Sequence, residues 1–555
     1  METNNFKNLQ FVRCNSIFSA PRAIVAYIGS FLSLEESILL ADSNKKVKSD
    51  IFSGKLQIHF LITNVANFNQ FLIHNPGISS LELFIADVIA DGKVCFDKIK
   101  TKNDFPILRD FFGKITALEL NCQYPDINWF NELLHLQMLE MAGSVVDISV
   151  CDKFPSLRKL KLRNYNATFS NQVLSSLPLE ELTVKSSPYF NFNNLTLPML
   201  RHITLDSFTT STIPSFEGCP NLTSIELHRI MPTILEPLSE LKQLKEFHLD
   251  TDLMDYYPFI KLDFLTNCVS LMKLTLIGIN VDSVDPLITC KSLEEICITD
   301  ADRLVDISAL TRLSHLRILT ICSENLDICN ITTFPSRLEI LQLTGKKMNG
   351  NIHFTSKLSQ LKLDFRNYMN NLSFLNNKLV QDNLTMLSLD NFLLDIGIKY
   401  LMGCKELRFL LVGGVTNKNA RVFTTLRKLR SICIKYSTFT NLNKLKNCTY
   451  IMYINLSDNP HLTDISGIGN FPLLQSIYCE NCPKISNFYA FAQCPGLSSI
   501  TLVNCGIVPL TAFKHCRDLN RLFIDNSIIT KEQILNAPDT EPRPILVRDD
   551  GYILS

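Results

Sequence analysis

Cys479 and Cys482 stand in a C-x-x-C arrangement, a spacing at which cysteines commonly hold a metal ion. Two thiolates so placed could bind zinc, whose structural sites take four cysteine or histidine ligands. Such a site normally needs a second ligand pair at a suitable spacing, and this pair stands alone. Both cysteines also occupy positions that are apolar in neighbouring segments of the chain. We therefore expect both side chains to pack in the core as small buried hydrophobes.

Other residue types that could do chemistry are scattered. Among the ten histidines, His202 and His248 are expected on one face of the molecule, but they take different positions in segments two repeats apart. Gly413-Gly414 and Gly467-Ile-Gly469 are too short for a phosphate-binding loop. No nucleophile, base and acid can be assembled into a site. The sequence therefore predicts no catalytic residues, no cofactor, no metal ligands and no enzymatic activity.

The elements that position these residues form a repeat. From Ile451 onward one sequence pattern occurs three times in succession, and a fourth copy begins at Leu519. Each copy has apolar residues at offsets 0, 3 and 5, and the first three carry Asn459, Cys482 and Cys505 at offset 8. This is the pattern L-x-x-L-x-L-x-x-N/C, by which the chain resembles the leucine-rich repeat proteins. Cys479 and Cys482 fall at its core offsets 5 and 8.

The second half of each copy has a different period. Leu304, Ile307, Leu310 and Leu313 are spaced by three, which places side chains on one face of a three-ten turn. The resemblance therefore implies an α/β solenoid: a leucine-rich repeat horseshoe or arc with a concave parallel β-sheet and short three-ten or helical convex segments. Because both ends of such a core would meet water, we also expect caps, the first of them an N-terminal helical cap.

The N-terminal part of the chain reads as three short helices. Pro21 suits a first helical turn, Ser33-Leu-Glu-Glu36 forms a capping box, and Lys45-Lys46-Val47 gives a basic third helix. Ile28 and Phe31-Leu32 supply apolar residues between Pro21 and the second helix. With this pattern the segment resembles an F-box. The resemblance implies that residues 19–53 dock the adaptor of a cullin-RING ubiquitin ligase. The residues expected to make that contact are Ile28, Phe31, Leu32, Leu34 and Leu39.

Four regions follow along the chain. Residues 1–54 hold the F-box-like helical segment, and residues 55–113 an N-terminal cap with an irregular first repeat. Residues 114–526 form the leucine-rich repeat solenoid, and residues 527–555 a C-terminal cap or tail.

Composition limits the partners and the location. Lys plus Arg and Asp plus Glu are equal at 54 each, so the chain has no global field that would attract nucleic acid or an anionic membrane. The N-terminus has no apolar run of signal-peptide length, and no stretch is long enough to span a bilayer. We therefore expect a cytoplasmic protein, with a nuclear location as an alternative and secretion excluded, whose cysteines are reduced.

The expected binding surface is the concave face, at offsets 2, 4, 6 and 7 of each copy. Its early copies carry Lys159, Lys161, Arg163 and Lys185 beside acids, which we interpret as a solvated face. Its late copies carry apolar and aromatic residues where polar ones cost least, namely Phe409, Leu411, Tyr436, Tyr453, Tyr478 and Phe523. Aromatic residues are the usual anchors of protein interfaces. The sequence thus predicts a non-enzymatic scaffold that binds a protein partner there, with an F-box-type substrate receptor of a ubiquitin ligase as the alternative.

Overall fold

The computed structural model describes the backbone at residues 59–62, 81–85 and 115–120, and most of the chain from residue 134 to residue 537. The stretches left out of that last range are 143–147, 164–170, 187–194, 208–212, 214, 231–234, 252–257, 349–350, 369–371, 394–397 and 526. The chain divides into two compact units, Met1–Thr251 and Asp252–Ser555. The F-box-like segment predicted at residues 19–53 lies outside the described residues, as do its expected docking residues Ile28, Phe31, Leu32, Leu34 and Leu39.

The first unit contains a parallel sheet in which each strand pairs with the next along the chain. Its strands are β1 (His59–Ile62), β2 (Leu81–Ile85), β3 (Ile115–Leu120), β4 (Met138–Ala142), β5 (Lys159–Arg163), β6 (Glu181–Lys185), β7 (His202–Asp206), β8 (Ser224–His228) and β9 (Glu246–Asp250). The connections carry short helices: η6 (Ile148–Lys153), α6 (Asn171–Ser176) and η7 (Glu236–Glu240), where η denotes a three-ten helix.

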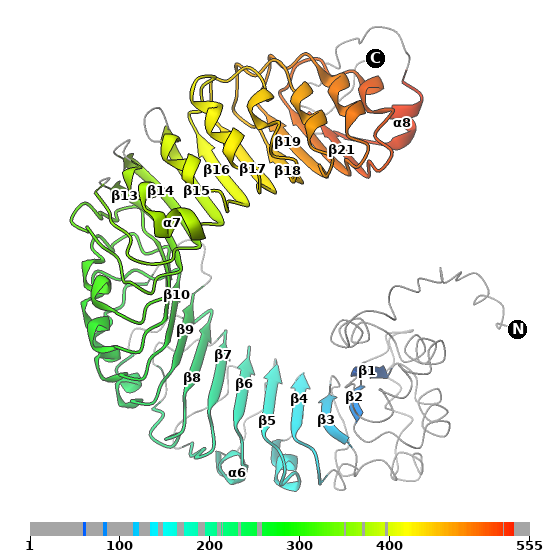
Figure 1. The fold of residues 1–555 in the computed structure, drawn as a ribbon. Helices are drawn as coiled ribbons and strands as arrows, with labels where there is room; N and C mark the ends of the chain where they lie inside the picture. Colours follow the sequence, from blue (N-terminus) through cyan, green and yellow to red (C-terminus); the bar gives the residue numbers. More distant parts are fainter. Residues whose placement is uncertain are drawn as a thin grey trace, which may run out of the picture. The chain divides into compact units, whose positions relative to one another are not determined.

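The second unit repeats this arrangement over more copies (Figure 1). Its strands are β10 (Lys273–Ile277), β11 (Glu295–Thr299), β12 (Ile318–Cys322), β13 (Ile340–Met348), β14 (Gln360–Tyr368), β15 (Met386–Leu393), β16 (Phe409–Gly413), β17 (Ser431–Lys435), β18 (Tyr453–Asn455), β19 (Ser476–Glu480), β20 (Ser499–Val503), β21 (Arg521–Ile524) and β22 (Ser527–Ile529). Its helices are η8 (Asp263–Asn267), η9 (Asp285–Thr289), η10 (Ser308–Arg312), η11 (Ser373–Asn376), α7 (Lys378–Asn383), η12 (Ile398–Gly403), η13 (Asn419–Thr425), η14 (Asn443–Leu445), η15 (Ser466–Asn470), η16 (Phe488–Gln493), η17 (Leu510–Phe513) and α8 (Lys531–Leu535).

The repeat pattern explains why these segments fold as they do. In the copy that opens at Leu474, the residues at offsets 0, 3 and 5 are Leu474, Ile477 and Cys479, and all three are buried. The strand residues between them alternate outward, because successive side chains of a strand point to opposite faces. Burying one such aliphatic side chain contributes about 1.5–3 kcal/mol, and the pattern recurs in every described copy. The predicted leucine-rich repeat solenoid, with strands on one side and three-ten turns on the other, is confirmed.

Strands end where one residue takes a left-handed backbone conformation. Positive φ angles occur at offset 7 of ten copies, at Ser186, Ser207, Arg229, Gly278, Asp300, Gly414, Tyr436, Asp458, Asn481 and Asn504. This conformation turns the chain out of the sheet, and glycine, asparagine and aspartate tolerate it best. Strand alternation predicted offset 7 on the concave face of the sheet. In these copies the residue lies in the turn beyond the strand, so the alternation of the strand no longer decides its direction.

Two neighbouring strands, β13 and β14, have nine residues each and run past this point. Gly345, at offset 7 of its copy, makes the continuation sterically possible. A Cβ atom there would lie 2.7 Å from the Phe365 ring and 2.8 Å from the Leu326 Cβ. The next copy places Phe365 at the same offset, fully buried, so here the position belongs to the core.

A buried polar ladder supports the sheet at offset 8. The Asn459 amide donates to the carbonyl oxygens of Ile434 (2.7 Å) and Leu456 (2.6 Å) and accepts from the Ser437 N–H (2.9 Å). In the next two copies a thiol takes this place: Cys482 donates to the Leu456 carbonyl at 3.0 Å and Cys505 to the Cys479 carbonyl at 3.4 Å. These bonds satisfy backbone groups that the left-handed turn removes from the sheet.

The C-terminal end of the sheet is covered by a different element. β22 pairs antiparallel to β21, and α8 follows it. A capping box of Thr530 and Gln533 starts α8, and Ile534 is buried. This segment falls within residues 527–555, for which the sequence predicts a C-terminal cap or tail. No helix among the described residues combines the length and the hydropathy that a membrane span requires.

Candidate functional site

The solvent-facing side of the strands, here called the open face, is formed by offsets 2, 4 and 6 of each copy. Between β16 and β21 the pairing register arranges these positions in rows that cross the strands. The offset-2 row is Phe409, Ser431, Tyr453, Ser476, Ser499 and Arg521. The offset-4 row is Leu411, Cys433, Asn455, Tyr478, Thr501 and Phe523. Five of the six residues predicted to bind a partner therefore share this face, separated by polar residues.

The sixth residue, Tyr436, lies just beyond the end of β17. Its φ angle is 48°, in the left-handed region, and 54% of the residue is exposed. A bulky aromatic residue is disfavoured in this conformation. The equivalent position in the next copy is Asp458, which fits the turn more easily. Tyr436 thus holds an exposed ring at a point where the backbone favours a small polar residue.

Tyr453 and Tyr478 are diagonal neighbours on β18 and β19, since Tyr453 pairs with Ser476 and Asn455 with Tyr478. Tyr453 is 37% exposed. The Tyr478 hydroxyl donates to a Glu480 carboxylate oxygen at 2.9 Å. This bond to an ionised acceptor holds the pKa of the Tyr478 phenol above its ordinary value, with partial burial adding to the effect. Glu480 therefore fixes the Tyr478 ring in a protonated, hydrogen-bonded pose.

The part of the open face that carries these five residues covers a limited area. Five strand spacings of about 4.8 Å separate Phe409 on β16 from Phe523 on β21, which gives about 24 Å across the strands. A five-residue strand is about 17 Å long. The patch of β16–β21 is thus about 400 Å² in plan, roughly half of what one partner buries in an interface of standard size.

The early strands carry charges that are paired with each other. Arg163 lies 2.5 Å from a Glu140 oxygen, Lys159 lies 2.7 Å from Glu181, and Lys185 lies 3.8 Å from Asp206. Each pair joins two adjacent strands. The basic residues of these strands therefore form cross-strand ion pairs with carboxylates, two of which, Glu140 and Asp206, expose only 5% and 6% of their side chains. The interpretation of the cluster around Lys161 as a solvated face stays a prediction.

The strands β7, β8 and β9 bring histidines together in a way that the sequence analysis missed. His228, His248 and Asp250 each offer a ligand atom, and these atoms lie within 4.8 Å of one another. The prediction from the sequence paired His248 with His202 and did not include His228. The signal was present in the repeat register, because Glu226 and His228 take offsets 4 and 6 of one copy and His248 and Asp250 take the same offsets of the next.

The cysteines serve the core. Cys479 and Cys482 are fully buried, as predicted. The recurring cysteines three residues before the opening positions are also buried. Several of their thiols donate to a carbonyl of the preceding copy, as in Cys448 to Phe423 (3.3 Å) and Cys494 to Ile468 (3.4 Å). Burial raises the pKa of the Cys448 thiol to about 12, so this sulfur stays protonated and unreactive at neutral pH.

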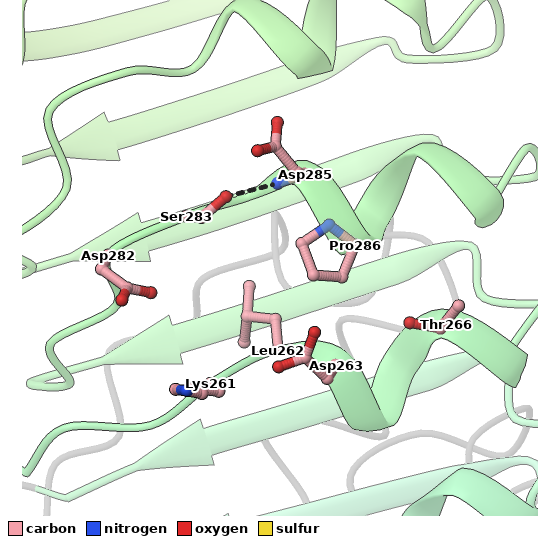
Figure 2. Close-up of a pocket in the computed structure, with 8 residues that line it drawn as sticks. All are labelled: Lys261, Leu262, Asp263, Thr266, Asp282, Ser283, Asp285 and Pro286. Carbon is pink, nitrogen blue, oxygen red and sulfur yellow. Dashed lines mark hydrogen bonds between the residues drawn. The ribbon is translucent and has the colours of Figure 1, made fainter.

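A surface pocket of about 360 Å³ lies between the turns of η8 and η9 (Figure 2). Asp263 and Asp285 line it from the first turns of these helices, with Asp282 and Lys261 nearby. An acid in a first turn interacts favourably with the helix dipole. The backbone N–H of Asp285 donates to the Ser283 hydroxyl at 3.0 Å, which closes the turn. These carboxylates have a structural explanation as part of the repeated turn.

No protein-family model and no curated protein matches the chain. Among solved structures, a leucine-rich repeat protein of Leptospira interrogans is 18% identical, with a TM-score of 0.44 over 78% of this chain and 95% of that one. The ectodomain of the receptor kinase GASSHO1/SCHENGEN3 of Arabidopsis thaliana is 15% identical, with a TM-score of 0.41 over 74% and 50% of the two chains. An internalin of Listeria monocytogenes is 16% identical, with a TM-score of 0.28 over 75% and 88%. These likenesses concern the fold at most. The repeat geometry of the chain itself establishes that it has the leucine-rich repeat fold.

Proposed function

We propose that this chain is a non-enzymatic interaction scaffold that binds a protein partner on the open face of β16–β21 and on the turn that follows β17. The observation that carries the proposal is Tyr436, an exposed aromatic ring kept on a left-handed backbone. Strained residues of this kind cost of order 1–3 kcal/mol and cluster at binding sites. Tyr453 adds a second exposed ring on the adjacent strand β18, at the opposite, N-terminal end of the strand.

The chemistry of the face suits a protein partner. Tyrosine supplies a large contact area at a low cost in conformational entropy, together with one hydroxyl for a polar contact. The intervening Ser431, Ser476 and Thr501 offer short hydroxyl groups between the rings. The parallel sheet holds all of these side chains at fixed spacings, so little ordering is needed on binding. The partner must also touch residues beyond this patch to reach a standard interface area.

Matched tyrosines allow a sharp test. Tyr450 is 55% exposed and lies in the turn before β18, three residues from Tyr453, and Tyr489 is exposed on η16. The full chain, a Tyr436→Ala/Tyr453→Ala variant and a Tyr450→Ala/Tyr489→Ala control would each be expressed in the native cells and captured. A protein held by the wild type and the control but lost from the first variant supports the proposal. Equal capture by all three chains contradicts it.

The ligase-receptor alternative depends on residues 19–53, which lie outside the described residues, and it stays a prediction from the sequence. Capture with the full chain and with a chain lacking residues 1–55 separates the two readings. A cullin and its adaptor that bind only the full chain would identify a substrate receptor. In that case the open face of β16–β21 would be the substrate-binding face. The predicted cytoplasmic or nuclear location likewise stays a prediction.

A further inference from the structure

Four potential metal ligands fill one rectangle of the open face in the first unit. Glu226 on β8 pairs with His248 on β9, and His228 pairs with Asp250. Offsets 4 and 6 of two adjacent strands point to the same side of the sheet. Two imidazoles and two carboxylates therefore share one side of the β8–β9 pair, each imidazole opposite a carboxylate.

The distances within this rectangle are short. The ring centroids of His228 and His248 are 4.7 Å apart. The His228 Nε2 atom lies 3.6 Å from a Glu226 oxygen, and its Nδ1 atom lies 3.9 Å from an Asp250 oxygen. His228, Glu226 and Asp250 expose 29%, 41% and 26% of their side chains, so an ion in water can reach them.

A zinc ion fits this arrangement after a small contraction. Zinc binds imidazole nitrogen and carboxylate oxygen at about 2.0–2.2 Å, which places tetrahedral ligand atoms about 3.3–3.6 Å apart. The ligand atoms of His228, His248 and Asp250 already lie within 4.8 Å of one another. Zinc binding would therefore draw the three ligand atoms together from within 4.8 Å to about 3.3–3.6 Å.

The surrounding charges leave the rectangle anionic. Asp206 is the pairing partner of His228 on β7, and Arg229 binds it at 2.6 Å. Arg229 is therefore paired with Asp206, which lies outside the rectangle. The two carboxylates of the rectangle carry two negative charges, which one divalent cation balances. Imidazole ligands favour transition metals over calcium and magnesium.

An outer layer of hydrogen bonds orients one of the ligands. The Thr204 hydroxyl donates to a Glu226 oxygen at 3.3 Å. Both ring nitrogens of the neighbouring His202 are engaged with hydroxyl groups, one with Thr204 at 3.0 Å and the other with Ser224 at 2.9 Å. Outer partners of this kind fix ligand orientation in metal sites. We propose that His228, His248 and Asp250 bind a divalent transition-metal ion of the zinc class on the open face, with Glu226 as fourth ligand or as acceptor for a bound water.

Titration of the full chain with zinc, followed by calorimetry, tests the site. We expect one strong site whose affinity falls at least tenfold in His228→Ala and in His248→Ala. The control variant His315→Ala, which removes an exposed histidine of the second unit, should keep it. A wild-type chain that does not bind zinc, or an equal affinity in all variants, overturns the proposal.

Cobalt as a spectroscopic probe identifies the ligand atoms. Histidine and carboxylate ligands give d–d bands, whereas cysteine ligands add a thiolate-to-cobalt charge-transfer band. A charge-transfer band that persists in His228→Ala would assign binding to cysteines and refute the site. Hydrogen exchange of the wild-type chain gives a test without variants. Zinc should slow exchange in peptides that cover β8 and β9 and leave β5 unchanged, and equal slowing in both would contradict the proposal.

Discussion

Replacing Tyr436 by glycine should leave the chain more stable than replacing it by alanine, the reverse of the usual order within a strand. Both changes remove the ring, so the comparison isolates the backbone at a φ of 48°. A left-handed conformation costs a residue with a Cβ atom about 1–2 kcal/mol, whereas glycine loses about 0.5–1 kcal/mol more chain entropy on folding. The difference favours Tyr436→Gly over Tyr436→Ala by about 0.5–1 kcal/mol.

The neighbouring residue supplies the control. Lys435 is the last residue of β17, so Lys435→Gly should be less stable than Lys435→Ala by about 0.5–1 kcal/mol. The two adjacent positions therefore give differences of opposite sign. A structure in which β17 simply continued through residue 436 would give the same sign at both.

Hydrogen exchange of the native chain is the suitable assay, because repeat proteins open locally as well as globally. The amides of Gly414 and Ser437 report on this turn, since Gly414 N–H donates to the Lys435 carbonyl at 3.2 Å and Ser437 N–H to Asn459 at 2.9 Å. If Tyr436→Ala protects these amides as well as Tyr436→Gly or better, the left-handed turn is not the conformation in solution. The strain that supports the binding proposal would then be absent.

Three further changes test the packing. Asn459→Ala removes three buried hydrogen bonds and should lower the free energy of unfolding, measured in urea, by about 2–4 kcal/mol. Asn459→Cys should cost about half as much, because cysteine occupies this offset in the next two copies. Equal costs for the two variants would contradict the ladder. Arg163→Ala removes the cation that is paired with the Glu140 carboxylate, which is only 5% exposed, and should lower the free energy of unfolding by about 1–3 kcal/mol. Lys159→Ala should lower it by only about 0.5 kcal/mol, because the Lys159–Glu181 pair is exposed. Thermal unfolding of both variants shows whether this order holds. Phe491→Ala empties a fully buried position beside Phe513, whose ring centroid is 5.4 Å away, and should lower the unfolding free energy by about 3–5 kcal/mol. Tyr489→Ala, in the same turn, should change the unfolding free energy by less than about 0.5 kcal/mol. Similar losses in the two variants would show that η16 faces the other way.

The sequence predicted the fold well because one rule governs most of it. Leu474, Ile477 and Cys479 are buried as their offsets require, and the same offsets decide burial in every described copy. A repeat multiplies a weak local signal, so the register could be read without knowledge of distant contacts. The long strands β13 and β14 escaped prediction because they depend on Gly345 meeting Phe365 and Leu326 from neighbouring copies.

The candidate sites were predicted less completely. The residues Phe409, Tyr453 and Phe523 could be assigned to the open face, because alternation along a strand is local. Their distribution over two rows required the pairing register between strands. The left-handed conformation of Tyr436 could not be predicted, because it depends on the turn after β17. The His228–His248 pair was missed because it forms only when adjacent copies are aligned residue by residue.

Photo-crosslinking from the open face tests the central claim most directly. A photoreactive p-benzoylphenylalanine would replace Tyr453 on β18 in the full chain, and in a second sample Tyr450 in the preceding turn, where exposure is similar or greater. The account predicts that the first position crosslinks to a protein in native cells, that Phe409→Ala and Phe523→Ala weaken this crosslink, and that the second position does not form it. Equal crosslinking from both positions, or a crosslink at residue 453 that both alanine changes leave intact, would contradict a binding site on the open face of β16–β21.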